Sequence, residues 1–382
     1  MVTALILINF LVILSFLVLI HELAHFLVAR KAGVKVEEFG LGLPPRAKIL
    51  LKDKLGTIYS LNWLPIGGFV RMSGEDEAED IKSPSSPPAD RLYAKSKRVR
   101  LAIIVAGTIA NFLVGVILFG GLYTYTGIPE PLGYVKVDEV IADTPAMTAG
   151  LQAGDKIIAA DDTKFPTADA FTDFVGKNRG RKIILTIERH ATNRQLEVYV
   201  RSETETPPGQ GPTGIFVTDT QIVKHPWWQM PFRGMAEGIK ISLNFIVGVV
   251  VGLGNALRNL LFAGTVPKDI AGPVGIGYQA VKHDLITPGL FSVKNLLFTA
   301  IISLNLAIIN LLPFPALDGG RALLVILEKL TSRRLRPQLE HWLNLASLGL
   351  LLTLFLLISA NDIGVIVNDS SVRDWLKAIF GR

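Results

Sequence analysis

The sequence predicts a polytopic α-helical membrane protein of about four transmembrane helices, with one inserted α+β domain. Three observations support this fold class. Hydrophobic residues make up 49% of the 382 residues and charged residues 19%, a balance typical of membrane proteins. Four apolar stretches reach, or nearly reach, the length that crosses a bilayer: residues 4–29, 99–123, 295–315 and 342–360. Residues 132–204 instead alternate apolar and polar residues, as the strands of a soluble domain do.

The rest of the composition limits the kinds of function. The net charge of +6 is modest and no basic patch is interleaved with aromatic residues, so nucleic acid is not expected as a partner. Cysteine is absent, which excludes disulfides and thiolate metal sites and leaves histidine and carboxylate ligands. The first apolar run is too long for a signal peptide and has no basic leader, so we expect a retained span.

That first span contains the motif HELAH at residues 21–25. Residues four apart lie on one face of a helix, so the imidazoles of His21 and His25 can reach one cation. Glu22 can then act as a base toward the attacking water. Ionisable side chains inside a span are costly and usually functional. The alternative is a histidine pair that only packs on an apolar face.

A third metal ligand has to come from elsewhere, because catalytic zinc usually takes three protein ligands. The best candidate is Asp318, within the segment NLLPFPALDGG at residues 310–320. Prolines and glycines flank this carboxylate, and such irregular backbone is tolerated at membrane depth only where protein or water lines a site. The alternative is an interfacial turn with a solvated aspartate.

Basic residues indicate the orientation of the spans. Residues 30–98 and 319–341 are rich in lysine and arginine, which the positive-inside rule places on the cytoplasmic side. With four spans, both termini and residues 124–233 are then outside. Asp318 and His25 both fall at the cytoplasmic ends of their spans, which agrees with a shared metal site.

The stretch 234–262 is ambiguous, because it is apolar but carries three charged residues and three asparagines. We expect an amphipathic helix at the membrane or beside the spans, since a fifth span would send the basic loop 319–341 outward. Proline and glycine in residues 202–212 predict a linker. The expected parts are residues 1–123 with two spans, 124–212 with the soluble domain and linker, 213–290 with the amphipathic segment, and 291–382 with the last two spans.

Together the two distant motifs resemble those of the site-2 protease family of intramembrane zinc metalloproteases, in particular the bacterial regulator-of-sigma-E protease type. The resemblance covers nearly the whole chain, with the family's HExxH motif in the first span and its NxxPxPxLDGG motif after the third. It implies His21, His25 and Asp318 as ligands of Zn²⁺ and Glu22 as the catalytic acid/base.

Further segments resemble the same family. Residues 107–111 match its GxxxN motif, in which the glycine would allow close helix approach and Asn111 could hydrogen-bond inside the bundle. Ordinary small-residue packing is the alternative for this segment. By resemblance, Asn310 would bond the extended backbone of a substrate, and Asn111 is a second candidate for substrate binding. Residues 271–276 also match a family segment, to which we assign no chemistry.

Residues 56–71 resemble the family's membrane-associated β-hairpin. Its physical use would be strand addition, because a substrate helix must unwind before cleavage and an exposed edge can take over its hydrogen bonds. Gly67, Gly68 and Phe69 are the candidate substrate-binding residues of this hairpin. A plain cytoplasmic hairpin is the alternative.

The soluble insert, residues 132–204, resembles a PDZ domain, which binds chain ends or extended segments at a sheet edge. The chain carries one such PDZ-like unit, whereas some relatives carry two in tandem. The unit could exclude substrates whose extracytoplasmic part is untrimmed, or it could be a structural or docking module. Both interpretations stay open.

The resemblance implies a zinc metalloendopeptidase of the bacterial inner membrane, with its PDZ-like domain extracytoplasmic and its active site toward the cytoplasm. Its partners would be the lipid bilayer and membrane-anchored single-span proteins, such as anti-sigma factors or signal-peptide remnants, cut after a first cleavage. The rivals are a metal-binding membrane scaffold or transporter, and a membrane zinc protease such as a prenyl-protein processing enzyme. Oligomeric state is left open. The remaining histidines are expected to be surface or structural: His190, His225, His283 and His341.

Overall fold

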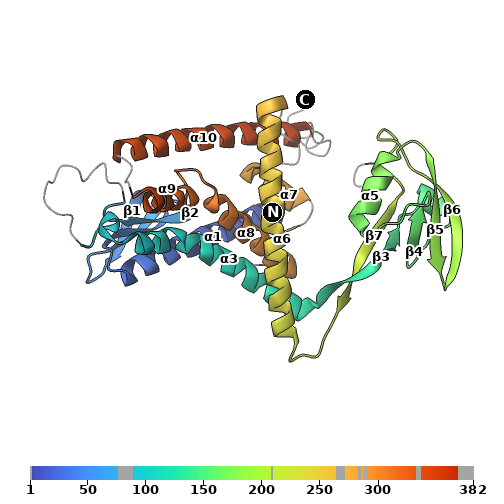
Figure 1. Cartoon of the computed structure of the whole chain (residues 1–382), viewed down its shortest axis with the longest axis horizontal. Coiled ribbons are helices and arrows are strands. Elements are labelled where there is room, and N and C mark those ends of the chain that lie inside the picture. The colour runs from blue at the N-terminus through green and yellow to red at the C-terminus, as the bar shows by residue number, and fades with distance from the viewer. Residues whose placement is uncertain are drawn as a thin grey trace. The chain divides into compact units, whose positions relative to one another are not determined.

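The computed structural model describes residues 2–75, 89–207, 210–263, 272–282, 285–287, 289, 291–332 and 337–368. Contacts group the chain into two compact units, Met1–Tyr123 with Gly234–Arg382, and Thr124–Arg233. Helices dominate the first unit, and a β-sheet dominates the second (Figure 1). The protein is therefore an apolar helical assembly with one inserted α+β domain, as the sequence predicted.

The first unit contains seven α-helices among its described residues: α1 (Val2–Lys31), α3 (Lys97–Thr126), α6 (Met230–Ala263), α7 (Pro273–Lys282), α8 (Val293–Leu311), α9 (Asp318–Thr331) and α10 (Pro337–Asn368), with a 3₁₀ turn, η1 (Leu92–Ala94). Of the described helices, α1, α3, α6, α8 and α10 contain segments long and apolar enough to cross a membrane. Length and composition thus add α6 to the four spans expected from the sequence. The number of spans stays a prediction.

The N-terminal half of α1 packs against α7 and α8. Phe10 of α1 meets Phe298 of α8 edge to face, with ring centroids 6.1 Å apart, and Ala280 of α7 belongs to the same buried cluster. α7 is also tied to α10, because the backbone N–H groups of Gly272 and Gly275 donate to the buried carboxylate of Asp362 at 3.0 and 2.8 Å. This contact gives Gly272 and Gly275, in the segment that matches the family, a physical role: they present helix N-terminal donors to an acid inside an apolar helix.

Two long bent strands, β1 (Val36–Lys52) and β2 (Ile58–Met72), follow α1 and pair with each other. Residues 38–41 are paired on both sides, with residues 68–71 and with residues 58–61. The sequence predicted a β-hairpin within residues 56–71. These residues supply only its second strand, β2, because the first strand, β1, begins at Val36. Arg30 at the end of α1 anchors the sheet by donating to Asp53 at 2.7 Å.

The second unit is an antiparallel sheet of five strands in the order β6-β5-β4-β3-β7. Its elements are β3 (Ile128–Val140), α4 (Pro145–Thr148), β4 (Lys156–Ala160), α5 (Ala168–Lys177), β5 (Lys182–Arg189), β6 (Thr192–Tyr199) and β7 (Ile215–Val223). The inward residues of the predicted alternating pattern, such as Ile183, Leu185 and Val198, are fully buried. β7 lies beyond residue 212, where the sequence suggested that the domain ends, because the chain turns at Gly214 and pairs with β3.

Candidate metal centre

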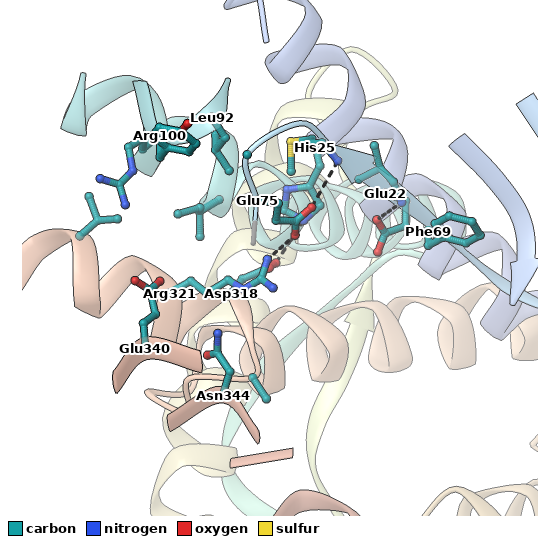
Figure 2. Close-up of a pocket in the computed structure, with 17 residues that line it drawn as sticks. Glu22, His25, Phe69, Glu75, Leu92, Arg100, Asp318, Arg321, Glu340 and Asn344 are labelled. Atoms are coloured by element: carbon teal, nitrogen blue, oxygen red, sulfur yellow. Dashed lines mark hydrogen bonds and ion pairs between the residues drawn. The ribbon is translucent and has the colours of Figure 1, made fainter. Parts of the chain in front are cut away.

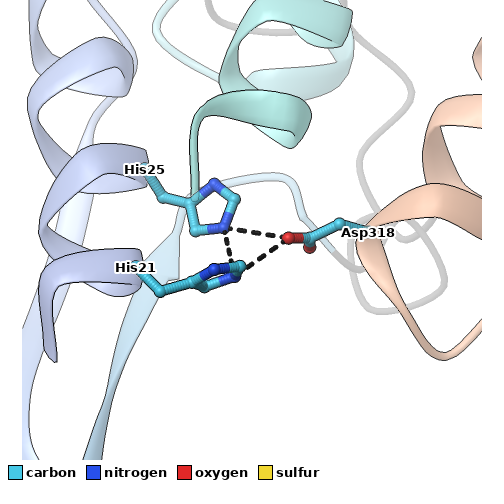
Figure 3. Close-up of side chains that lie close together, drawn as sticks. All are labelled: His21, His25 and Asp318. Carbon is cyan, nitrogen blue, oxygen red and sulfur yellow. Dashed lines mark hydrogen bonds and ion pairs between the residues drawn. The ribbon is translucent and has the colours of Figure 1, made fainter. Parts of the chain in front are cut away.

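Three side chains converge at one point (Figure 3), and they come from two helices that are far apart in the sequence, α1 and α9. The Nε2 atoms of His21 and His25 on α1 are 3.0 Å apart. Oδ2 of Asp318, the first residue of α9, lies 3.0 Å from His21 Nε2 and 3.2 Å from His25 Nε2. Both histidines are buried. The structure thus brings together the three residues that the sequence proposed as ligands, nearly 300 positions apart.

Local backbone requirements explain how Asp318 reaches α1. The chain leaves α8 at Leu311 and folds back over a short turn, in which Leu317 N–H donates to Phe314 C=O at 2.8 Å. A Cβ at Gly319 would collide with the Leu311 carbonyl, and one at Gly320 with the Phe314 carbonyl. The two glycines of the LDGG motif therefore let α9 start directly against the end of α8.

The donor set fits a small divalent cation. Tetrahedral ligands about 2.0–2.1 Å from zinc lie about 3.3 Å from one another, close to the three separations measured here. Oδ2 of Asp318 is buried, and no described residue donates a hydrogen bond to it. Two imidazole nitrogens and one carboxylate oxygen are a usual catalytic zinc set, and they leave the fourth position open.

Both imidazoles have neighbours at their second ring nitrogen. Nδ1 of His25 lies 2.8 Å from the carbonyl oxygen of Ile103, so its N–H can donate there and leave Nε2 free for a metal. Nδ1 of His21 lies 3.4 Å from Asn111 and 3.5 Å from Asn310. The two asparagines that the sequence proposed for substrate binding therefore both lie beside a candidate ligand.

Glu22 does not contact the three ligand atoms through a hydrogen bond. Its Oε2 accepts the backbone N–H of Val70 in β2 at 3.1 Å, and it faces a cavity of about 250 Å³ that also reaches His25 and Asp318 (Figure 2). This space is far larger than one water needs. The position next to the ligands, in a polar cavity, is suited to a proton-transfer group.

Charged side chains also line this cavity, at positions that no sequence motif indicated. Arg321 forms an ion pair with Glu75 at the end of the hairpin, and Arg100 pairs with Glu328 at 2.8 Å. Arg321 lies one helical turn after Asp318, and this spacing could have predicted that its side chain lies near the candidate metal centre. Glu75, in contrast, is brought here only by the fold of the hairpin.

The proposed substrate-binding residues of the hairpin lie along α1. Gly67 donates its N–H to Ser15 Oγ at 3.2 Å, and its φ of 71° suits a residue without a side chain. A Cβ at Gly68 would fall 2.9 Å from the Gly40 carbonyl oxygen. Phe69 lines the cavity (Figure 2). These residues form the border between the sheet and the candidate metal centre.

The other described histidines are elsewhere. His225 pairs with Glu130 at 2.8 Å, His190 occupies the turn between β5 and β6, and His341 contacts the ring of Trp342. His283 lies outside the described residues. Among the described residues, the metal-type cluster is therefore the triad of His21, His25 and Asp318.

Comparisons with known proteins agree along most of the chain. The model of peptidase family M50 matches residues 9–354. A Rickettsia conorii protein provisionally named a zinc metalloprotease is 30% identical over 361 residues, covering 93% of this chain and 98% of that protein. A Clostridium perfringens protein with the same kind of name is 32% identical over 357 residues, covering 91% and 96%. The zinc metalloprotease RasP of Geobacillus kaustophilus is 27% identical over 431 residues, covering 93% and 97%.

Solved structures of PDZ domains match about a quarter of the chain. The PDZ domain of an SdrC-like protein from Listeria monocytogenes is 23% identical, covers 24% of this chain and 95% of that chain, and gives a TM-score of 0.21. The corresponding domain from Listeria innocua is 26% identical, covers 24% and 99%, and gives a TM-score of 0.19.

Proposed function

Since this chain belongs to peptidase family M50 and is a zinc metalloprotease, we propose that it hydrolyses peptide bonds within or near the transmembrane segments of membrane-anchored proteins. One observation carries the proposal. The triad of His21, His25 and Asp318 lies between helices that are long and apolar enough to cross a membrane. A catalytic centre among such helices suits a substrate that is itself held in the membrane.

In this proposal His21, His25 and Asp318 hold the zinc ion. Zinc, when bound, supplies a Lewis acid that polarises the scissile carbonyl and lowers the pKa of water. Glu22 takes a proton from the attacking water and gives it to the leaving amine. Its Oε2 accepts the Val70 N–H, which leaves the other carboxylate oxygen for the water, and the cavity beside it has room for that water.

The edge of β2 is proposed to hold the substrate in an extended form. The N–H groups of Gly67 and Val70 are directed at α1, where Ser15 and Glu22 accept them. An extended peptide could add to the same edge, with Phe69 and Asn310 beside it. Unwinding is required because a helical peptide keeps its scissile amides inside its own hydrogen bonds.

The direction of the helices supports four spans. α8 runs in the same direction as α1, since Phe298 near its start packs on Phe10 and Asn310 at its end lies beside His21. α3 runs the opposite way, so the chain must cross the membrane an even number of times between α3 and α8. α7 has ten residues, too few for a span of about 20.

α6 is therefore proposed to lie along the membrane rather than across it. Figure 1 shows α6 crossing the direction of α1 and α3 steeply, and a Cβ at Gly238 would fall 2.8 Å from Gly120 N of α3. With four spans, the basic loops are cytoplasmic, the metal centre lies toward the cytoplasm of a bacterial inner membrane, and the PDZ-like sheet is extracytoplasmic.

The proposed substrates are single-span proteins already shortened by a first cleavage, such as anti-sigma factors or signal-peptide remnants. The PDZ-like sheet would then exclude untrimmed substrates or dock them. These assignments rest on the family resemblance described above and on the position of the triad among apolar helices.

Glu22→Gln tests the proposal. The variant keeps the three candidate ligands and should retain zinc, but it should lose cleavage of a membrane-anchored reporter by about 10²-fold or more. A comparison of membrane fragments from cells with wild-type and variant enzyme should then show uncut single-span proteins. Unchanged fragments would favour a scaffold or transporter, whose work does not need the proton-transfer group.

A further inference from the structure

One face of α3 carries three residues at intervals of four, Ile103, Gly107 and Asn111, and each contacts the candidate ligands. The Ile103 carbonyl lies 2.8 Å from His25 Nδ1. A Cβ at Gly107 would lie 2.6 Å from His21 Nε2 and closer still to His25 Nε2. Asn111 lies 3.4 Å from His21 Nδ1. The spacing on α3 thus matches the spacing of the histidines on α1, and the GxxxN motif faces the imidazoles.

Asn111 is fully buried, and only one end of its side-chain amide has a hydrogen-bond partner among the described residues. Its amide nitrogen is the atom beside His21 Nδ1, whereas no described residue donates to its Oδ1. A buried carbonyl oxygen without a donor costs about 1–3 kcal/mol. The oxygen and nitrogen of a side-chain amide are told apart by their hydrogen-bond partners, so the partners of Asn111 decide which atom faces His21.

The proton position on His21 decides between the two orientations. Its Nε2 faces His25 Nε2 and Asp318 Oδ2, both at 3.0 Å, so Nε2 is the side that offers a lone pair to a cation. A neutral imidazole with a free Nε2 carries its proton on Nδ1 and needs an acceptor there. Rotating the Asn111 amide by a half turn supplies that acceptor and satisfies the orphan oxygen.

We propose that Asn111 is a positioning residue for the metal centre: its amide oxygen accepts the Nδ1–H of His21 and keeps Nε2 directed at the cation. This inference rests on the zinc site of the proposed function and replaces the substrate-binding role expected for Asn111. The Ile103 carbonyl does the same for His25. Gly107, between them, leaves room for both rings, so one helix face fixes both ligand tautomers.

Asn310 is less suited to this role. It is partly exposed, and its amide nitrogen is 3.5 Å from both Nδ1 and Nε2 of His21. A group at equal distance from both ring nitrogens does not select one tautomer. Asn111 can select one tautomer of His21, because its contact is with Nδ1.

Zinc affinity of the full-length protein, measured by competition with a chelator, tests the proposal without a substrate. Asn111→Leu keeps the side-chain volume but offers no acceptor, so zinc affinity should fall about 10–100-fold. Asn111→Asp keeps an oxygen at the same place and should stay within about threefold of wild type. The absorption bands of bound Co²⁺ should change in the leucine variant and persist in the aspartate variant.

Ser303→Ala is the matched control, because Ser303 Oγ donates at 2.7 Å to the backbone carbonyl of Asn111 and not to its side chain. Its zinc affinity should be unchanged. If Asn111→Leu does not fold, Asn111→Ala removes the acceptor without adding bulk and should weaken zinc binding in the same way.

Two results would overturn the proposal. Zinc affinity could be the same in Asn111→Leu, Asn111→Ala and wild type, with only the KM of cleavage raised, which would return Asn111 to substrate binding. Alternatively, Asn111→Asp could lose as much zinc affinity as Asn111→Leu. That result would show that residue 111 affects the metal centre through side-chain packing and not through an acceptor oxygen. Failure of the protease function is distinct: it would show as absent cleavage while zinc affinity still depended on residue 111.

Discussion

The carboxylate of Glu22 accepts a hydrogen bond from the backbone of Val70, with 3.1 Å between Oε2 and the amide nitrogen. The candidate proton-transfer group on α1 is therefore held by the edge of β2. An extended peptide that adds to this edge would use the same N–H groups. Occupation of the edge and the position of Glu22 are thus coupled through one backbone amide.

Val70→Pro removes this amide proton. Proline is tolerated at an edge strand where the N–H points away from the sheet, and Val70 donates to α1 rather than to its strand partner. Loss of a hydrogen bond to a charged group costs about 1.5–3 kcal/mol, so kcat/KM for a membrane-anchored reporter should fall about 10–100-fold while zinc content is unchanged.

Val70→Ala is the control for this variant, because it shortens the side chain and leaves the N–H in place. It should cleave the reporter nearly as well as wild type. Equal activity of the proline and alanine variants would show that the amide of residue 70 takes no part in positioning Glu22 or the substrate.

Helix geometry made part of this site predictable. His21 and His25 are four apart in a continuous helix, so their convergence follows from the helical repeat alone. Asp318 was predictable from the prolines and glycines that flank it beside an apolar segment, and the orientation of the basic loops agreed with that choice. Val70 and Glu75 were not predictable, because they reach the cavity only through pairing between residues 38–41 and 68–71, a contact that no local pattern encodes.

At other positions one sequence pattern is compatible with two different structures. A glycine in an apolar helix, such as Gly107, suits a close helix crossing as well as a close aromatic ring, and only the structure identifies the imidazoles as its neighbours. β7 was missed for a similar reason. Its partner β3 lies more than seventy residues earlier. The proline-rich segment before Gly214 predicts a linker, and no local pattern indicates the pairing that follows it.

Gly107→Ala should reduce zinc affinity by about tenfold or more, as loss of ligand orientation usually does. The added methyl group would press on both imidazoles, with His21 Nε2 only 2.6 Å away. Titration with zinc against a chelator measures the effect. Gly121→Ala in the same helix is the control, since a Cβ there meets no atom within 4 Å; equal affinity in both variants would contradict the packing described here.

Asp318→Ala should lose the third ligand and with it most of the bound zinc. Breaking one of three protein bonds to the metal leaves two histidines on one helix turn, which hold zinc weakly. Metal content of the purified protein gives the result directly. Glu340→Ala, which removes another acid lining the same cavity, should keep its zinc, and full zinc in Asp318→Ala would exclude this residue as a ligand.

The five-stranded sheet of the second unit should lose stability in acid through one buried pair. Asp155 is 1% exposed and accepts two hydrogen bonds from Arg189, each at 2.6 Å. Burial raises the pKa of Asp155, but the bonds from Arg189 and from the Gln152 N–H outweigh it, so this pKa lies below its usual value. The pair therefore contributes fully above the unfolded-state pKa, and its contribution is lost as pH falls through the folded-state pKa.

Hydrogen exchange of the β4 and β5 amides in the full chain measures this effect. Protection should be constant from neutral pH to about 4 and then decrease. Arg189→Met leaves the buried carboxylate unpaired and should destabilise the sheet by about 3 kcal/mol at neutral pH. The difference in stability between Arg189→Met and wild type should become smaller in acid, because a neutral Asp155 can be buried without the arginine charge. Arg181→Met removes the exposed pair with Asp161 and should have little effect; an equal loss in both variants would show that burial of Asp155 is not the cause.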